Sequence, residues 1–273
     1  NAELTESYDE RTQISSLRTI FGELFKIFLI TLFFTVFLVD PNPEIDGRMN
    51  PTAYSQMGQI SAICAIISIL ISTLGTFNQV PRLERKTQSS RSVKWWKGYT
   101  EIISALQIKA FRTLCLGFIF FTIMAGITTA LALYFMSYFW EFTQEQSMYI
   151  LIAMGLAVIP GAILTPIIQK IFDKKGGAII ALIFYALIYC TPIMLRLLGL
   201  MPDNHTSDLF YLMLMFHFSG QIFVMIGLIL SESMMADVTD EYELETENRQ
   251  EGLLYSATMF ARKASFGIGG FFA

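Results

Sequence analysis

Charged residues are scarce in this sequence. Of its 273 residues, 15% are Asp, Glu, Lys or Arg, whereas 53% are hydrophobic. A soluble domain carries about 25% charged residues, so this chain lacks the polar surface that a soluble enzyme needs. The same composition excludes a disordered tail and a collagen-like fibre. The net charge of −4 excludes little, because the placement of charge matters more than its sum in an apolar chain.

Histidine and cysteine are also rare, with two and three residues respectively. Cys64, Cys115 and Cys190 all lie inside apolar runs, so we expect no disulfide framework. His217 is flanked by phenylalanines and is expected to be a packed polar residue, so a metal site has almost no support. A Gly-rich phosphate loop and a GxSxG elbow are missing as well. This stretch therefore lacks the motifs for ATP-driven pumping and for serine hydrolysis.

Long hydrophobic runs are what the sequence has instead. Each run is long enough to cross about 30 Å of hydrocarbon as a helix that rises 1.5 Å per residue. Transmembrane strands would alternate over about ten residues, and these runs are unbroken. We therefore predict an all-α integral membrane protein with about seven transmembrane helices. The predicted segments are Leu17–Val39, Met57–Phe77, Leu114–Phe139, Tyr149–Ile168, Ala178–Leu200, Leu209–Leu230 and Gly252–Phe272.

The lysines and arginines of the connections predict the orientation. Arg48 stands alone on one side, and all the other connection residues of this kind fall on the side of the first stretch. Because basic loops stay in the cytoplasm, the first residues are expected to be cytoplasmic and the protein to be a multi-pass protein of the cell (inner) membrane. The cytoplasmic set is Arg11, Arg18, Arg82, Arg85, Lys86, Arg91, Lys94, Lys97, Lys109, Lys170, Lys174, Lys175 and Arg249.

The longest connection, Gln79–Arg112, predicts the domain boundary. Trp95, Trp96 and Tyr99 recur in it at helical spacing between charged residues, which is typical of an amphipathic helix on a membrane surface. We predict the end of one helical half at residues 1–80, a cytoplasmic linker at 81–112 and a second helical half at 113–273. Because the chain starts with Asn and stops within an apolar run, we expect it to be part of a longer protein.

Lys263 is the most informative single residue, because it lies about halfway along the last apolar segment with Arg262 beside it. A charge at the centre of a bilayer costs roughly 2.5–3.5 kcal/mol. We predict that Lys263 faces an aqueous cavity, where it binds an anion or substrate or holds carboxylates near a cation site. The alternative is structural pairing with an acid on another helix. For Glu23, Lys26, Arg112, Arg196 and Glu232, near segment ends, we expect ion pairs or snorkelling.

An acidic loop between the last two segments faces the basic loops of the same side. Ion pairs between loops of the two helical halves could close the cytoplasmic end and break when it opens. Exposed pairs are worth about 0–1 kcal/mol each, which suits a reversible gate. The alternative is a solvated acidic loop. The candidate gate residues are Asp237, Asp240, Glu243, Arg249, Arg11, Lys174, Lys175 and Asp173.

The last stretch, Ala236–Lys263, resembles the signature of the glycoside–pentoside–hexuronide:cation symporter family of the major facilitator superfamily. Asp173-Lys174-Lys175-Gly176 is similar to the superfamily's turn between helices eight and nine, and Tyr134-Phe135 with Tyr138 to an aromatic run in helix seven. The resemblance covers nearly the whole chain and assigns it to about helices five to eleven. The signature positions are Ala236, Asp237, Asp240, Glu243, Arg249, Glu251, Tyr255, Ser256 and Lys263, and the first loop, Ala2–Arg18, is similar to the family's loop after helix four.

The resemblance implies two helical halves that rock about a central cavity, with substrate and coupling ion near the midplane. It makes Lys263 a residue near the cation and sugar sites and Arg18 one that faces the sugar; Tyr255 and Tyr134 are further substrate-binding candidates. Two departures concern the same pocket: Leu228 stands where the family's sugar pocket has a tryptophan, and Arg262 where it is apolar. The extra positive charge of Arg262 would suit an anionic substrate such as a hexuronide.

These observations predict a secondary active transporter that moves a sugar or glycoside by cation-coupled alternating access and is not an enzyme. The alternatives are a lipid or lysolipid carrier of the same fold and, less favoured, a polytopic membrane enzyme. We expect no cofactor beyond a coupling cation, Na⁺ or H⁺, whose carboxylate site lies outside this stretch, and no metal site within it. The expected partners are a small-molecule substrate and membrane lipid, not nucleic acid, and the expected state is a monomer.

Overall fold

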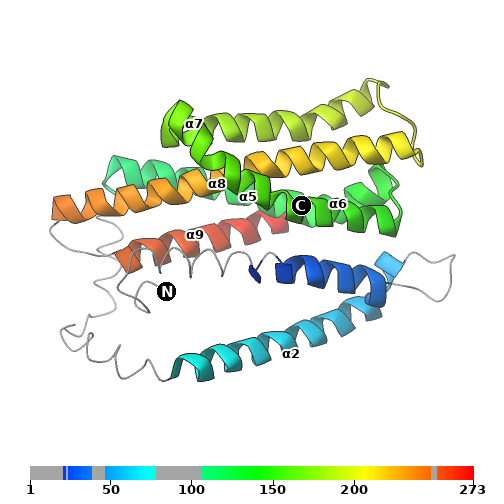
Figure 1. Cartoon of the computed structure of the whole chain (residues 1–273), viewed down its shortest axis with the longest axis horizontal. Helices are drawn as coiled ribbons and strands as arrows, with labels where there is room; N and C mark the ends of the chain where they lie inside the picture. The colour runs from blue at the N-terminus through cyan, green and yellow to red at the C-terminus, as the bar shows by residue number, and fades with distance from the viewer. Residues whose placement is uncertain (1–20, 23, 39–46, 78–105, 247–250) are drawn as a thin grey trace. The chain divides into compact units, whose positions relative to one another are not determined.

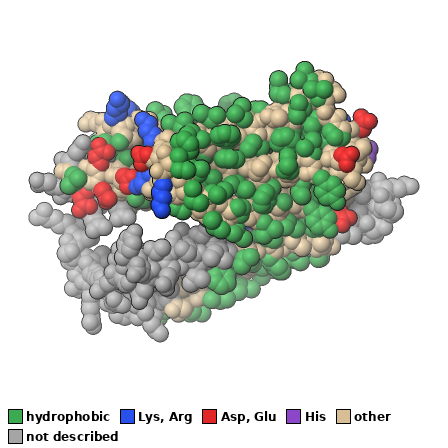
Figure 2. Space-filling view, turned by 45° about the horizontal axis from the view of Figure 1, so that its top comes forward, with side chains coloured by type: hydrophobic (Ala, Val, Ile, Leu, Met, Phe, Trp, Pro, Cys, Tyr) green, Lys and Arg blue, Asp and Glu red, His purple; other side chains and the backbone are tan. Residues whose placement is uncertain are grey.

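The computed structural model describes residues 21–22, 24–38, 47–77, 106–246 and 251–273. In this part of the chain every regular element is a helix, which confirms the predicted all-α class. Hydrophobic side chains cover the long middle stretch of the helices, and charged side chains gather toward the ends (Figure 2). Four stretches are long and apolar enough to cross a membrane, namely Pro51–Gly75, Lys109–Phe139, Gln144–Leu197 and Ser207–Leu244.

The predicted segments agree with the helices except at a few points: Leu38 and residues 198–200 lie beyond helix ends, and the segment Tyr149–Ile168 passes from one helix to the next through a turn at Ala157. The acidic stretch expected to be a loop is helical instead, since the helix that carries it continues to Thr246. The stretch Gln144–Leu197 contains two predicted segments, and the last helix carries Arg262 and Lys263 within its apolar run. The elements are an apolar helix at Leu24–Phe37 whose end is the π-helix η1 (Phe33–Phe37), then η2 (Gly47–Met49), α2 (Pro51–Thr76), α5 (Lys109–Tyr134), the π-helix η4 (Phe135–Phe139), α6 (Gln144–Leu156), α7 (Val158–Leu197), α8 (Ser207–Thr246) and α9 (Glu251–Phe272).

The described residues fall into two compact units. The first unit takes its residues from Asn1–Ser92 and Gln144–Gly155, and the second from Val93–Thr143 and Leu156–Ala273. The predicted linker 81–112 lies outside the described residues up to residue 105, so its amphipathic helix stays a prediction.

The first unit holds α6 against the helix at Leu24–Phe37. A Cβ atom added to Gly155 would lie 2.9 Å from a side-chain carbon of Ile27, so the two helices approach closely at this glycine. The start of α2 is fixed locally, because Asn50 caps it by accepting a hydrogen bond from the Thr52 N–H at 3.1 Å and Pro51 occupies its first position.

In the second unit α7 doubles back on itself at Asp173 (Figure 1). This residue has φ 60° and ψ 171°, a conformation that non-glycine residues rarely adopt, and it separates two helical arms. Both arms pack on α8 through small residues. A Cβ atom on Gly161 of the first arm would lie 2.8 Å from the Cβ of Met225, and Ala178 and Ala181 of the second arm form a buried cluster with Ile226 and Leu230. The turn therefore accounts for two of the predicted crossings within one continuous helical stretch.

α5 and α9 cross at a still closer contact. A Cβ atom on Gly126 would lie 2.2 Å from the Phe266 carbonyl oxygen, and one on Gly269 would lie 2.1 Å from the Ile123 carbonyl oxygen. Because both obstacles are backbone atoms, only glycine allows the two helices to approach this closely. Small residues serve the same purpose in transmembrane helix pairs generally, since packing replaces the missing hydrophobic driving force in lipid.

We predict that Gly126→Ala lowers the stability of the protein by about 1–3 kcal/mol, because the added methyl group must push α5 and α9 apart. The thermal unfolding midpoint in detergent is the measurement. Gly117→Ala on the same helix is the matched control, since nothing lies within 4 Å of its added Cβ, and it should leave the midpoint unchanged or slightly raised. Equal midpoints for the two variants would contradict the close approach.

Candidate functional site

The described candidate site residues lie on α5, α7, α8 and α9, all within the second unit. Lys263, Arg262 and Tyr255 lie on α9, Leu228 on α8 and Tyr134 at the end of α5. Arg11, Arg18 and Arg249 lie outside the described residues, so their predicted roles stay predictions.

One face of α9 is buried against its neighbours. Leu254, Thr258, Ser265 and Gly269 are buried and follow each other at intervals of four, seven and four residues, which places them on one side of a helix. This face carries the glycine contact with α5 and the polar contacts described below. The rest of α9 is therefore available to lipid, water or other parts of the protein.

Lys263 lies on a different face of α9, about 100° around the helix from Arg262. Most residues along this face are small or polar and exposed, with Met259 as the large apolar member, and Phe260 and Phe266 flank Lys263 three residues before and after it. The glycines among them have nothing within 4 Å of an added Cβ atom. We call this set the Lys263 face: Gly252, Ser256, Met259, Lys263, Gly267 and Gly270.

The remaining exposed side of α9 has the opposite character. Phe260, Ile268 and Phe271 are 76%, 48% and 85% exposed, and no charged residue lies among them. Helices that span a membrane present such large apolar side chains to lipid. The separation of an apolar face from the Lys263 face is typical of a helix that meets lipid on one side and a polar space on another.

Lys263 itself is exposed, and no described residue makes an ion pair or hydrogen bond with it. The described part of the chain therefore offers no acidic partner for Lys263, as the structural alternative to a functional role would require. The neighbouring Arg262 does have such a partner.

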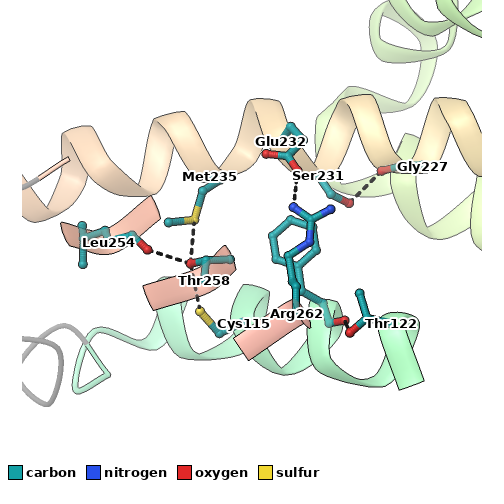
Figure 3. A network of polar contacts seen from close by, with 10 residues as sticks. Cys115, Thr122, Gly227, Ser231, Glu232, Met235, Leu254, Thr258 and Arg262 are labelled. Atoms are coloured by element: carbon teal, nitrogen blue, oxygen red, sulfur yellow. Dashed lines mark hydrogen bonds and ion pairs between the residues drawn. The ribbon is translucent and has the colours of Figure 1, made fainter. Parts of the chain in front are cut away.

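Arg262 pairs with Glu232 of α8. Its Nη1 donates to the Glu232 Oε1, and its guanidinium carbon lies 4.5 Å from the ring centroid of Phe118 on α5. Figure 3 shows the arginine reaching from α9 to the carboxylate on α8. The guanidinium thus has an opposite charge and an aromatic face, both favourable environments for a cation. The extra positive charge that the sequence places beside Lys263 is balanced by Glu232.

A second polar contact lies one turn away on the same face of α9. Thr258 donates to the Leu254 carbonyl oxygen at 2.9 Å, and its hydroxyl lies 3.7 Å from the Cys115 sulfur of α5 and 3.9 Å from the Met235 sulfur of α8 (Figure 3). Around it, buried side chains of the three helices form one cluster. α5, α8 and α9 therefore meet in a junction that fixes the place of Arg262 and Glu232.

The aromatic candidates occupy the far end of α5. The rings of Tyr134 and Tyr138 are stacked, with centroids 6.1 Å apart and planes 24° apart, and each residue is 63% exposed. The π-helix η4 begins directly after Tyr134, and such π-bulges occur frequently at functional sites. Leu228 and Tyr255 are partly exposed, and neither contacts Lys263 through a hydrogen bond.

Lys174 and Asp237 form the ion pair that the structure shows among the predicted gate residues. Lys174 Nζ donates to both carboxylate oxygens, at 2.7 and 2.6 Å. The lysine follows the α7 turn at Asp173, so the pair ties this turn to α8. Lys175, Asp240 and Glu243 are exposed nearby in sequence. Both partners belong to the second unit, so this pair does not join the two predicted halves.

A buried arginine in the first unit is a site that the sequence analysis missed. Arg48 is 8% exposed, and its Nη1 donates to the hydroxyl of Ser147, which is completely buried, at 3.0 Å. Gln144 of the same helix, α6, donates to the Phe34 carbonyl oxygen at 2.7 Å. The one available signal was that Arg48 is the lone basic residue of its predicted side. We call these contacts the α6 clasp.

No group of three or more His, Cys, Asp or Glu residues within the described ranges could hold a metal ion. His217 bonds to its own helix, with Nδ1 2.8 Å from the Met213 carbonyl oxygen, and its ring centroid lies 5.5 Å from that of Tyr189. The described surroundings of His217 are thus those of a packed polar side chain.

We predict that Ser147→Ala lowers the stability of the protein by about 1–3 kcal/mol, because it leaves a buried guanidinium N–H without this acceptor. The measurement is again the thermal unfolding midpoint. Ser55→Ala removes a hydroxyl from an exposed position of α2 and should change nothing. An unchanged midpoint for Ser147→Ala would show that the hydrogen bond between Arg48 and Ser147 makes no net contribution to the stability of the protein.

Comparison with known families, proteins and structures gives one match. No curated protein and no solved structure matches the chain. The family model described as MFS/sugar transport protein matches residues 1–273, which is the whole chain. With its apolar helices, this makes the chain an integral membrane transporter and not an enzyme. The chain belongs to the MFS/sugar transport protein family, within the major facilitator superfamily.

Proposed function

We propose that the protein is a secondary active transporter that moves a sugar or glycoside together with a cation by alternating access. Membership of the family supports a transporter. The substrate class and the coupling to a cation are inferred from the chain's own residues. The signature at Ala236–Lys263 resembles that of cation symporters, and this resemblance supports the coupling. The carboxylates that would hold Na⁺ or H⁺ are expected outside this stretch of the protein.

The observation that carries the proposal is the position of Lys263. Lys263 lies near the middle of the 22-residue helix α9, on a face of mostly small and polar residues, and no described residue forms an ion pair with it. A cation held in lipid would cost roughly 2.5–3.5 kcal/mol, so this face is expected to meet water and substrate instead. An ammonium donates three hydrogen bonds, which suits sugar hydroxyls or a carboxylate of the ion site.

A pair of aromatic residues offers a second place for a sugar, at another level of the helices. The stacked rings of Tyr134 and Tyr138 are exposed and carry hydroxyls, so they offer both a flat apolar surface and hydrogen-bonding groups. Phe118 is level with Arg262, and Tyr134 is sixteen residues further along α5, so the tyrosines lie roughly 20 Å from the level of Lys263. Ligand sites commonly combine apolar lining with a few placed polar groups. The glycines of the Lys263 face leave open space beside the ammonium.

The Lys174–Asp237 pair is proposed as part of the cytoplasmic gate. The distribution of lysine and arginine supports a cytoplasmic position for the α7 turn. Holding this turn against α8 would keep the cytoplasmic end closed in one state, and an exposed pair is weak enough to break in the other.

The proposal is tested by uptake into liposomes that contain the purified protein. The panel consists of radiolabelled neutral sugars and glycosides, their uronides, and lysolipids, each with and without an imposed Na⁺ or H⁺ gradient. Gradient-driven accumulation of a sugar is the expected result. Lysolipid movement without sugar uptake would favour the lipid carrier, and uptake that ignores both gradients would contradict symport.

We predict that Lys263→Gln lowers gradient-driven sugar uptake at least about tenfold, because a hydrogen bond from a charged group is worth about 1.5–3 kcal/mol. The amount of protein in the membrane should stay the same, since Lys263 is exposed and forms no ion pair or hydrogen bond with a described residue. Lys109→Gln, which removes an exposed lysine at the start of α5, is the control. Normal coupled uptake by the Lys263 variant would refute the role.

We predict that Asp237→Asn raises the rate at which a membrane-impermeant thiol reagent labels Met259→Cys from the cytoplasmic side. Losing about 1 kcal/mol from the closed state corresponds to roughly fivefold faster labelling. The test uses a background in which Cys64 and Cys190 are replaced, because these cysteines are not buried. Asp203→Asn, in the turn before α8, should not alter labelling; an unchanged rate for Asp237→Asn would count against the gate.

A further inference from the structure

Glu232 of α8 lies deeper among the helices than the acidic gate residues. Asp237 is five residues further along the same helix, which corresponds to about 7.5 Å along its axis. α8 is continuous from Ser207 to Thr246, so both carboxylates belong to one rigid element. Glu232 thus lies just beyond the apolar run that ends at Leu230, between the gate residue Asp237 and the apolar part of α8.

The partner of Glu232 is enclosed, whereas Glu232 itself is not. The Arg262 side chain is 20% exposed and the Glu232 side chain is 45% exposed. The guanidinium lies over the ring of Phe118, which is 4% exposed. Since the aromatic ring covers one side of the arginine, the carboxylate occupies a more open side. An anion that approached Arg262 would therefore compete with Glu232.

Lys263 follows Arg262 directly in the chain, so two cationic side chains start from Cα atoms about 3.8 Å apart. Glu232 neutralises one of them, and among the described residues none neutralises the other. This stretch of α9 and α8 therefore carries a net charge of about +1 with Glu232 ionised, and would carry about +2 without it.

We propose that Glu232 sets the charge selectivity of the sugar path: by holding Arg262 it favours uncharged sugars over uronides. The inference rests on the proposed function and adds the substrate class. A neutral sugar gains little from a further positive charge, whereas a uronide carboxylate gains much. In general, one unit charge within about 10 Å of an anion, at an effective dielectric constant of about 20, changes the affinity for that anion roughly tenfold or more.

The experiment measures uptake of methyl glucoside and methyl glucuronide, or of whichever neutral sugar the panel identifies with its uronide, by the protein in liposomes. The quantity is the ratio of uronide to neutral uptake. Glu232→Gln should raise this ratio at least about tenfold, because it frees the guanidinium at nearly constant side-chain size. Arg262→Gln should lower it, and the double variant E232Q/R262Q should return it toward the wild-type value.

Asp208→Asn is the matched control, since it removes one carboxylate from an exposed position of the same helix and should leave the ratio unchanged. A pair that only joins α8 to α9 would give a different result: Glu232→Gln would lower both uptakes equally, and the double variant would not restore a ratio that had never moved. If Glu232→Gln fails to reach the membrane, the opposite shift in Arg262→Gln and its reversal in the double variant provide the same test.

The outcomes separate this inference from the proposed function. Wild-type uptake of neutral sugar with a ratio that Glu232→Gln leaves unchanged overturns the inference alone. Wild-type preference for the uronide also overturns it, because Glu232 would then fail to exclude the anion. Wild-type uptake of neither compound class overturns the proposed function and the inference together.

Discussion

The cost of placing a charge among apolar helices organises the described part of this protein. Arg262 offsets that cost through its ion pair with Glu232 and its contact with the ring of Phe118. Arg48, in the connection before α2, is also buried and donates to the hydroxyl of Ser147. Lys263 is the exception, since no described side chain forms an ion pair with it. Arg262 is therefore held in place between helices, whereas the exposed Lys263 has no ion-pair partner among the described residues. The proposed role in substrate binding concerns Lys263 and not its neighbour.

The same junction shows why these charges can be placed accurately. α5 and α9 touch backbone to backbone at Gly126 and Gly269, so the distance between the two helices is fixed within narrow limits. The hydroxyl of Thr258 bridges toward sulfur atoms of both neighbouring helices one turn away from Arg262. A guanidinium that must reach both a ring on α5 and a carboxylate on α8 needs such a rigid frame. The close packing of α5 and α9 thus helps to hold Arg262 where it can contact both Phe118 and Glu232.

Much of the fold could be predicted from the sequence, and less of the site. Apolar runs fix where helices lie, because a helix in lipid must satisfy its own backbone and cover itself with hydrophobic side chains. The pairing of Glu232 with Arg262 could not be predicted, since 30 residues separate them and the contact depends on how α8 and α9 cross. Arg48 gave even less signal, because its partner Ser147 is 99 residues away and is an ordinary hydroxyl in the sequence. A charged residue in an apolar run predicts that a partner or a polar space lies beside it, but the sequence does not identify that partner.

The location of the Lys174–Asp237 pair changes how a gate at this end can work. Both residues belong to the second unit, so breaking their bond does not by itself separate two halves. The pair instead fixes the strained turn at Asp173 against α8, the helix that also carries Glu232. A shift of α8 along its axis would therefore act on both ion pairs at once, at the gate and about 7.5 Å deeper. In this arrangement α8 carries both Asp237 of the proposed gate and Glu232, which pairs with Arg262 beside Lys263. Breaking one ion pair by a shift of α8 would therefore also strain the other.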